Sequence, residues 1–245
     1  MMGLKDDLPS SFLFVGGSGV GKTMLVKEYS SYLNRPLIRL DMSEYKESHT
    51  ISKIIGSPPG YVGYDDNDNV LEKVRNCPCS IILLDEIEKA NSDVINLFYQ
   101  VLDEGIMTNS HNEKISFKNT IIIMTSNIGM LNDNIGFLEN KKETNLNSYL
   151  SIPFINRINY IIYFNKLNKD NIIKIIKNRI NYLNKKYNRY NVKFKLNEKI
   201  LEKIINDSEY KIYGARKLNK ILNELYENSI LDNIIYNKKK CVHNL

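Results

Sequence analysis

The chain has 245 residues, of which 42% are hydrophobic and 25% charged, and it carries a formal net charge of +6. This composition is typical of a folded globular protein and excludes a mainly disordered chain, and no apolar run reaches the length of a membrane-spanning helix. The excess charge comes largely from lysines scattered among asparagines in the last third, which favours a solvated surface over a nucleic-acid site.

The first predicted element is a strand at residues 12–15, and a glycine-rich loop follows it directly. The loop fits the pattern G-x-x-x-x-G-K-S/T, in which backbone N–H groups turn onto phosphate oxygens. Lys22 adds a positive charge, and the Thr23 hydroxyl can ligate Mg²⁺. A glycine-rich turn without a ligand is the alternative, but the helical pattern after the loop disfavours it. The expected phosphate-binding residues are Gly16, Gly17, Ser18, Gly19, Val20, Gly21, Lys22 and Thr23.

Later segments predict the rest of the fold. Strand-like runs alternate with helix-length segments, which predicts an α/β protein with a mostly parallel sheet covered on both faces. After about residue 165 the apolar residues recur at helical spacing, with one short strand at 192–196. We therefore expect a large nucleotide-binding subdomain at 1–164 and a small, mainly helical subdomain at 165–245. The further strands are expected at 37–40, 80–84, 120–124 and 160–164.

Two strand ends carry candidate catalytic side chains. Asp85 and Glu86 end a buried apolar strand, so they should lie at the same sheet edge as the phosphate loop. There Asp85 would hold Mg²⁺, while Glu86 would polarise the water that attacks the γ-phosphate. Asn127 ends another strand and could orient that water. Helix capping by the acids, and a turn role for the asparagine, are the structural alternatives.

An aromatic loop at 60–64 reads Gly-Tyr-Val-Gly-Tyr and follows two prolines. Glycines on both sides relax the backbone, and exposed tyrosines on such a loop indicate contact with a partner. Tyrosines folded back onto the core are the alternative.

Together these segments resemble a Clp-type AAA+ ATPase, specifically the second ATPase module of the two-ring Clp unfoldases, over about residues 4–236. The resemblance implies an AAA+ P-loop domain followed by a helical lid, with ATP and Mg²⁺ as cofactors. The motifs that carry it, besides the phosphate loop, are Leu-Asp-Met-Ser-Glu-Tyr at 40–45, Gly-Ser-Pro-Pro-Gly-Tyr-Val-Gly-Tyr at 56–64, Leu-Leu-Asp-Glu-Ile-Glu-Lys-Ala at 83–90 and Met-Thr-Ser-Asn at 124–127.

The resemblance also implies roles for two arginines. Arg157, in Phe-Ile-Asn-Arg-Ile, matches the arginine finger that reaches the nucleotide of a neighbouring subunit, which requires a homohexameric ring. Arg216, in Gly-Ala-Arg, matches the sensor of the small domain. Ordinary surface arginines are the alternative for both.

Three loops match segments that meet partners in this family. Tyr61 and Val62 would line the axial pore and grip unfolded polypeptides, and residues 109–118 would form a second pore loop. Ile135, Gly136 and Phe137 match the loop that docks on a Clp-type peptidase, with a hydrophobic tether under a mobile loop as the alternative.

The implied function is an ATP-driven unfoldase that threads polypeptides through a pore and delivers them to a Clp-type peptidase. A disaggregase without a peptidase and a non-hydrolysing structural ring subunit are the alternatives, while the pore tyrosines argue against a nucleic-acid-dependent loader. The family's adenine-contacting segment lies upstream of residue 1, so we expect an N-terminally truncated chain with weak or no ATPase activity alone. The Asn, Lys and Ile bias suggests an AT-rich genome and a plastid of the apicoplast type, with no membrane or nucleic-acid partner.

Overall fold

The computed structural model describes residues 8–57, 69–128, 146–188, 192–195, 197–236 and 241–244. The predicted pore residues Tyr61 and Val62 and the predicted docking loop at 135–137 lie outside these ranges. The chain forms two compact units, one of residues 1–16 with 22–164 and the other of residues 17–21 with 165–245.

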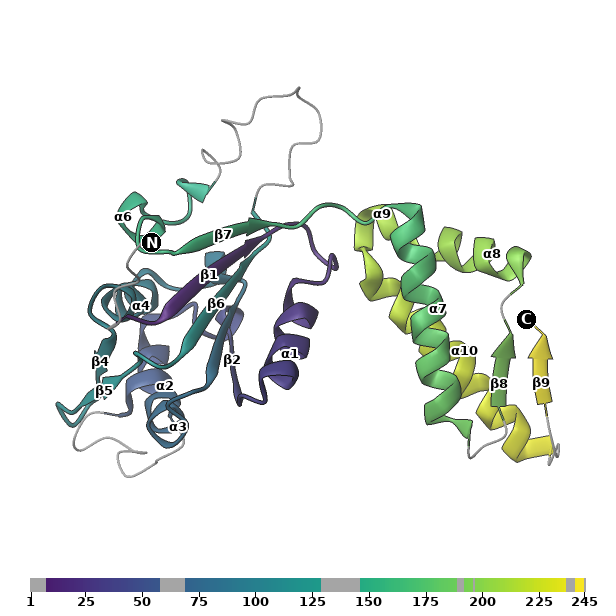
Figure 1. Ribbon diagram of the computed structural model, residues 1–245, viewed down its shortest axis with the longest axis horizontal. Helices are drawn as coiled ribbons and strands as arrows, with labels where there is room; N and C mark the ends of the chain where they lie inside the picture. The colour runs from purple at the N-terminus through teal and green to yellow at the C-terminus, as the bar shows by residue number, and fades with distance from the viewer. Residues whose placement is uncertain are drawn as a thin grey trace, which may run out of the picture. The chain divides into compact units, whose positions relative to one another are not determined.

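The first unit is built on a five-stranded sheet with the strand order β2-β3-β6-β1-β7 (Figure 1). All neighbouring strands are parallel, which confirms the predicted parallel sheet. Parallel strands place their carboxyl ends at one edge, so the segments that follow them are neighbours there. The strands are β1 (Ser10–Val15), β2 (Leu37–Asp41), β3 (Ile81–Asp85), β6 (Ile121–Ser126) and β7 (Tyr160–Tyr163).

Helices cover both faces of this sheet, because alternate residues of each strand point to opposite sides. On one face Leu83 and Ile123 pack with Val26 of α1 (Lys22–Leu33). On the other face Leu84 and Met124 belong to a larger core, to which four helices contribute. These helices are α2 (Ser52–Ile55), α3 (Val70–Asn76), α4 (Ser92–Glu104) and α6 (Ile152–Ile155). The central strand β3 is buried along its whole length, as expected of a continuous apolar run between two helical layers.

Short elements complete the first unit. They include a hairpin of β4 (Ile106–Thr108) and β5 (Lys114–Ser116), which the sequence did not predict. Residues 109–118, which the resemblance treats as a loop, therefore contain a strand. The buried Asn109 closes the turn, because its Oδ1 accepts hydrogen bonds from the N–H groups of His111 and Glu113. The remaining elements are the 3₁₀ turns η1 (Met42–Glu44), η2 (Ser48–Ile51) and η3 (Ile87–Lys89).

The second unit is mainly helical, as predicted. Asn168 caps α7 (Lys169–Lys186) and Asn197 caps α8 (Glu198–Ser208), because each side-chain oxygen accepts a hydrogen bond from a main-chain N–H of the first turn. Buried isoleucines and leucines of α7 pack with Leu218 and Leu222 of α10. The Tyr226 hydroxyl lies between Ile180 O and Asn184 Oδ1, and burial raises its pKa above the ordinary value. The elements are α7 (Lys169–Lys186), β8 (Val192–Lys195), α8 (Glu198–Ser208), α9 (Tyr210–Tyr213), α10 (Ala215–Tyr236) and β9 (Cys241–Asn244).

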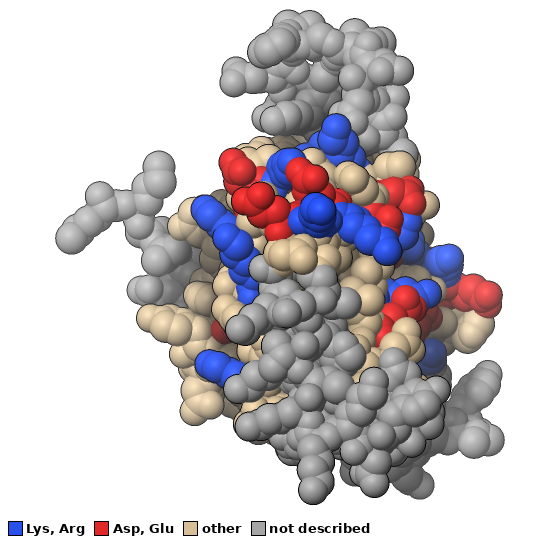
Figure 2. Space-filling view, turned by 90° about the vertical axis from the view of Figure 1, so that its right-hand side faces the viewer, with Lys and Arg blue, Asp and Glu red and all other residues tan. Residues whose placement is uncertain are grey.

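Strand β9 pairs in parallel with β8 and was not predicted. Among the described residues, no helix is both long and apolar enough to cross a membrane. Lys and Arg side chains are interspersed with Asp and Glu side chains on the face drawn in Figure 2, so the described part of this face has no extended field of one sign.

Candidate functional site

The phosphate-loop sequence begins where β1 ends, at the carboxyl edge of the sheet. The Gly16 N–H donates to Ser126 O at 3.1 Å, and a Cβ on Gly16 would lie only 2.8 Å from Phe164 Cβ, so this position requires glycine. Lys22 begins α1 and is 6% exposed, and its ammonium group donates to Gly16 O at 2.6 Å and to Asn127 Oδ1 at 2.9 Å. The first turn of α1 also presents main-chain N–H groups, which suits an anion.

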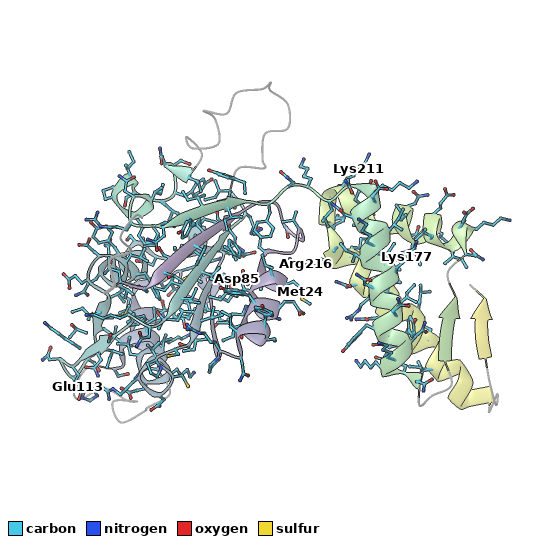
Figure 3. All side chains as sticks on the ribbon, in the orientation of Figure 1. Met24, Asp85, Glu113, Lys177, Lys211 and Arg216 are labelled. Carbon is cyan, nitrogen blue, oxygen red and sulfur yellow. The ribbon has the colours of Figure 1, made fainter. Side chains whose placement is uncertain are left out.

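Asp85 ends β3 at the same edge and is 6% exposed (Figure 3). Its Oδ1 accepts hydrogen bonds from two hydroxyls, Thr23 Oγ1 at 3.0 Å and Thr125 Oγ1 at 2.6 Å. Its Oδ2 accepts from Arg39 Nη2 at 2.7 Å, so a guanidinium compensates the buried negative charge. The structure thus brings together the two predicted Mg²⁺ ligands, Thr23 and Asp85.

Glu86 and Asn127 also meet, although they are far apart in the sequence. Asn127 Nδ2 donates to Glu86 Oε1 at 3.0 Å, and Lys89 forms an ion pair with Glu86 Oε2. This contact with Glu86 raises the pKa of the Lys89 ammonium group, because it stabilises the charged form. Glu86 has a φ of 60°, and its N–H donates to Thr125 Oγ1 at 3.0 Å. A left-handed conformation is uncommon for a residue other than glycine, and such residues often mark functional sites.

The oxygen donors at this edge fit a magnesium ion. Mg²⁺ prefers hard oxygen ligands and is commonly bound by one or two protein groups together with phosphate oxygens and water. The Thr23 hydroxyl and the Asp85 carboxylate are such groups and lie 3.0 Å apart. No cluster of three or more His, Cys, Asp or Glu side chains suited to a metal occurs among the described residues. With the two oxygens of Thr23 and Asp85, the site suits a metal whose other ligands are phosphate oxygens and water.

The contacts that the structure shows for the Arg157 side chain are with residues outside this cluster. It follows α6, whose first turn is capped by Ser151. Its Nε forms an ion pair with Asp103 Oδ1 at 2.5 Å, and its guanidinium lies 5.8 Å from the ring centre of Tyr99. Both partners belong to α4, and the Arg157 side chain remains 43% exposed. The structure therefore holds Arg157 at the surface with half of its side chain available to a further partner.

The middle of the phosphate loop packs within the second unit, against the start of α10. The Ala215 N–H donates to Gly19 O at 3.0 Å, and a Cβ on Gly19 would lie 2.4 Å from Tyr213 O. Gly214 makes the matching approach, since its added Cβ would lie 2.6 Å from Gly19 O. Arg216 follows directly in the first turn of α10 and is exposed. The structure therefore places Arg216 on the helix whose start contacts residues 17–21.

Sequence reasoning missed four residues of the site, namely Arg39, Thr125, Glu88 and Lys89. An arginine flanked by the apolar residues Ile38 and Leu40 of strand β2 was a signal for the first of them. Glu88 contacts Asn127 through a hydrogen bond from the Asn127 N–H to Glu88 Oε1 at 3.0 Å. Glu88 and Lys89 lie in the segment at 83–90 that carries the family resemblance, and Thr125 lies in the one at 124–127, but these segments gave no signal of their contacts.

Comparison with known proteins covers almost the whole chain. Residues 7–161 match the family model described as AAA domain (Cdc48 subfamily), and residues 167–243 match the C-terminal, D2-small domain of ClpB protein. The chaperone protein ClpB of Aquifex aeolicus is 42% identical over 95% of this chain and 25% of its own length. The ATP-dependent Clp protease ATP-binding subunit ClpE of Streptococcus pneumoniae is 41% identical over 93% of this chain and 32% of its own length.

A solved structure of Hsp104 with ATPyS and FITC casein has a TM-score of 0.83 and 32% identity, over 95% of this chain and 42% of that one. The chain thus spans a quarter of the Aquifex relative and about a third of the Streptococcus relative. The two family matches fall in turn on the residues of the two units, and the solved structure matches over 95% of this chain.

Proposed function

The chain belongs to the Clp-type AAA+ ATPases, and we propose that it is a motor module that hydrolyses ATP in order to unfold polypeptides. One observation carries this proposal. Lys22, Asn127 and Glu86 form a continuous chain of contacts beside the Thr23–Asp85 pair, at the edge where the phosphate loop begins. A phosphate-binding cation, an oxygen pair for a metal and a carboxylate for water activation are the parts that phosphoryl transfer to water needs.

The residues have distinct proposed roles. The N–H groups of residues 16–23 and the Lys22 ammonium bind the phosphates of ATP. Thr23 and Asp85 would hold Mg²⁺, which when bound neutralises phosphate charge. Glu86 orients a water molecule and accepts its proton, and Asn127 positions that carboxylate. Lys89 and Asn127 each engage one oxygen of Glu86, and each oxygen keeps a second lone pair that can accept from the water.

We propose that two arginines complete the site in an assembled homohexameric ring. The exposed half of Arg157 would reach the γ-phosphate bound by a neighbouring subunit, where a cation stabilises charge in the transition state. Arg216 would report the state of the nucleotide to the small subdomain at 165–245, since it follows the segment that contacts Gly19. The large subdomain would then span residues 1–164.

The substrates and partners follow from the family and are also proposals. Tyr61 and Val62 would grip an unfolded polypeptide in the ring pore, and residues 135–137 would dock on a Clp-type peptidase. A disaggregase without a peptidase is the second candidate, because relatives named ClpB match as well as one named as a Clp protease subunit. A plastid location rests on composition alone and would be tested by imaging the tagged protein.

The decisive experiment replaces Glu86 with Gln in the assembled protein. We expect ATP to bind as before while its hydrolysis falls by about 100-fold or more, because the general base is lost. The matched control is Glu47→Gln, since Glu47 is an exposed acid that forms an ion pair with His49 at the surface. Unchanged hydrolysis in Glu86→Gln, or no ATP binding by the unaltered protein, would contradict the proposal.

The choice between the two candidate functions needs a separate test. Deleting residues 135–137 from the assembled protein should abolish binding to a Clp-type peptidase and leave ATP hydrolysis intact. If the intact protein binds no such peptidase, the disaggregase is favoured.

A further inference from the structure

Glu88 lies in η3, the single turn that follows the proposed catalytic carboxylate. We propose that Glu88 is a positioning residue for Asn127, which it holds in the orientation that joins Lys22 to Glu86. This inference rests on the proposed ATPase function and assigns a further residue to the same site.

The peptide unit that joins Ser126 to Asn127 is bound on both sides, because Ser126 O accepts from the Gly16 N–H and the Asn127 N–H donates to a side chain. Strand β6 ends at Ser126, so the next N–H group lies beyond the ladder. That N–H donates to Glu88 Oε1 at 3.0 Å, and the following N–H of Ile128 donates to Ser126 Oγ at 3.2 Å. A hydrogen bond to a carboxylate is stronger than one between neutral groups. Glu88 is therefore the side chain that holds the N–H side of this peptide unit, where the chain leaves the strand.

This backbone position controls two contacts of the side-chain amide. Asn127 Oδ1 accepts from Lys22 Nζ at 2.9 Å, and Asn127 Nδ2 donates to Glu86 Oε1 at 3.0 Å. An ammonium group can only donate and a carboxylate can only accept, so these two neighbours fix which way the amide points. Because the amide is planar and short, a shift of its backbone would change both contacts together.

The hydrogen bonding and burial of the Glu88 carboxylate do not suit a second general base. Its Oε1 is occupied by the Asn127 N–H, and its Oε2 is buried with no hydrogen-bond partner among the described residues. A base must reach the water that it deprotonates. The buried Oε2 is closed to such a water and Oε1 is engaged by the Asn127 N–H, so we assign the action of Glu88 on the reaction to Asn127.

The test compares Glu88→Ala with Glu88→Gln in the assembled protein. Gln keeps an oxygen that can accept from the Asn127 N–H, whereas Ala removes the acceptor. We expect Glu88→Ala to lower kcat by about 10- to 100-fold, since small misplacements of catalytic groups cost this much. We expect the KM for ATP to change by less than about threefold, because the phosphate loop is intact. Glu88→Gln should keep at least about half of the kcat.

A double-mutant cycle separates this role from a general structural one. If Glu88 acts only through Asn127, adding Glu88→Ala to Asn127→Ala should lower kcat by less than about twofold further. If the double variant lowers kcat by the product of the two single effects, the proposal is overturned. It is also overturned if Glu88→Gln lowers kcat as much as Glu88→Ala does.

Hydrogen exchange at the Asn127 amide supplies a readout that does not need turnover. It should become faster in Glu88→Ala and remain slow in Glu88→Gln. If the unaltered protein hydrolyses no ATP, the proposed function fails, but the exchange result still shows whether Glu88 holds the Asn127 backbone. Should Glu88→Ala not fold, Glu88→Asp withdraws the carboxylate by one methylene and is expected to show the same faster exchange. Unchanged exchange in the folded variant would overturn the inference.

Discussion

Thr125 links the two acidic residues of the site, so its replacement separates hydrogen bonding from packing. The side chain is fully buried, and its hydroxyl donates to Asp85 Oδ1 at 2.6 Å while accepting from the Glu86 N–H at 3.0 Å. Thr125→Val keeps the shape of the side chain but removes both hydrogen bonds. Thr125→Ser keeps the hydroxyl and removes only a methyl group. The two variants therefore form a matched pair.

The size of each effect can be worked out from these contacts. A hydrogen bond to a charged group contributes about 1.5–3 kcal/mol, and an unsatisfied buried N–H costs about 1–3 kcal/mol. In Thr125→Val both terms apply, but Thr23 still donates to the same Asp85 oxygen. We therefore expect the free energy of unfolding to fall by about 3 kcal/mol, near the lower end of the two terms added together. Thr125→Ser should lose about 1 kcal/mol, the value of one buried methyl group.

The assay is urea unfolding at constant pH, from which the free energy of unfolding of each variant is obtained. The expected order of stability is the unaltered protein, then Thr125→Ser, then Thr125→Val. If Thr125→Val is as stable as Thr125→Ser or more stable, packing outweighs the hydroxyl bridge and the reasoning is refuted.

Three further predictions concern other parts of the molecule. Tyr226→Phe removes a buried hydroxyl that is hydrogen-bonded in the helical unit, so its free energy of unfolding in urea should fall by about 1–2 kcal/mol, and an unchanged value would contradict the geometry. Arg75 lowers the pKa of the Glu113 carboxyl below its ordinary value of 4.5, so the pair stabilises the fold above that pH and this contribution is lost as the pH falls through the folded-state pKa. Glu113→Gln should therefore flatten the acid dependence of unfolding, measured in urea between about pH 3 and pH 6, and an unaltered profile would speak against the pair. Gly214→Ala forces a Cβ to within 2.6 Å of Gly19 O at a φ of 57°, so thermal unfolding should show a loss of about 1–3 kcal/mol, and a native-like Tm would show that the approach can relax.

Much of the fold follows from local patterns in the sequence. The predicted strands at 12–15, 37–40, 80–84, 120–124 and 160–164 lie within one or two residues of the observed ones. The apolar run of β3 ends at its first acid, and the spacing of isoleucines in α7 matches its buried face. The hairpin β4–β5 and strand β9 were missed, because three- or four-residue strands carry too little periodicity to stand out.

The sequence by itself therefore determined the chemistry available to this protein: the phosphate loop, the acids at a strand end and the asparagine at another. These features are local, since each needs only a few adjacent residues and the element that presents them. Tertiary structure alone decided which side chains meet. Arg39 reaches Asp85 because β2 lies beside β3, and Glu88 reaches Asn127 because β6 lies on the other side of β3. The order of strands in a parallel sheet is set by crossover connections and long-range packing, so no local pattern could assign these partners.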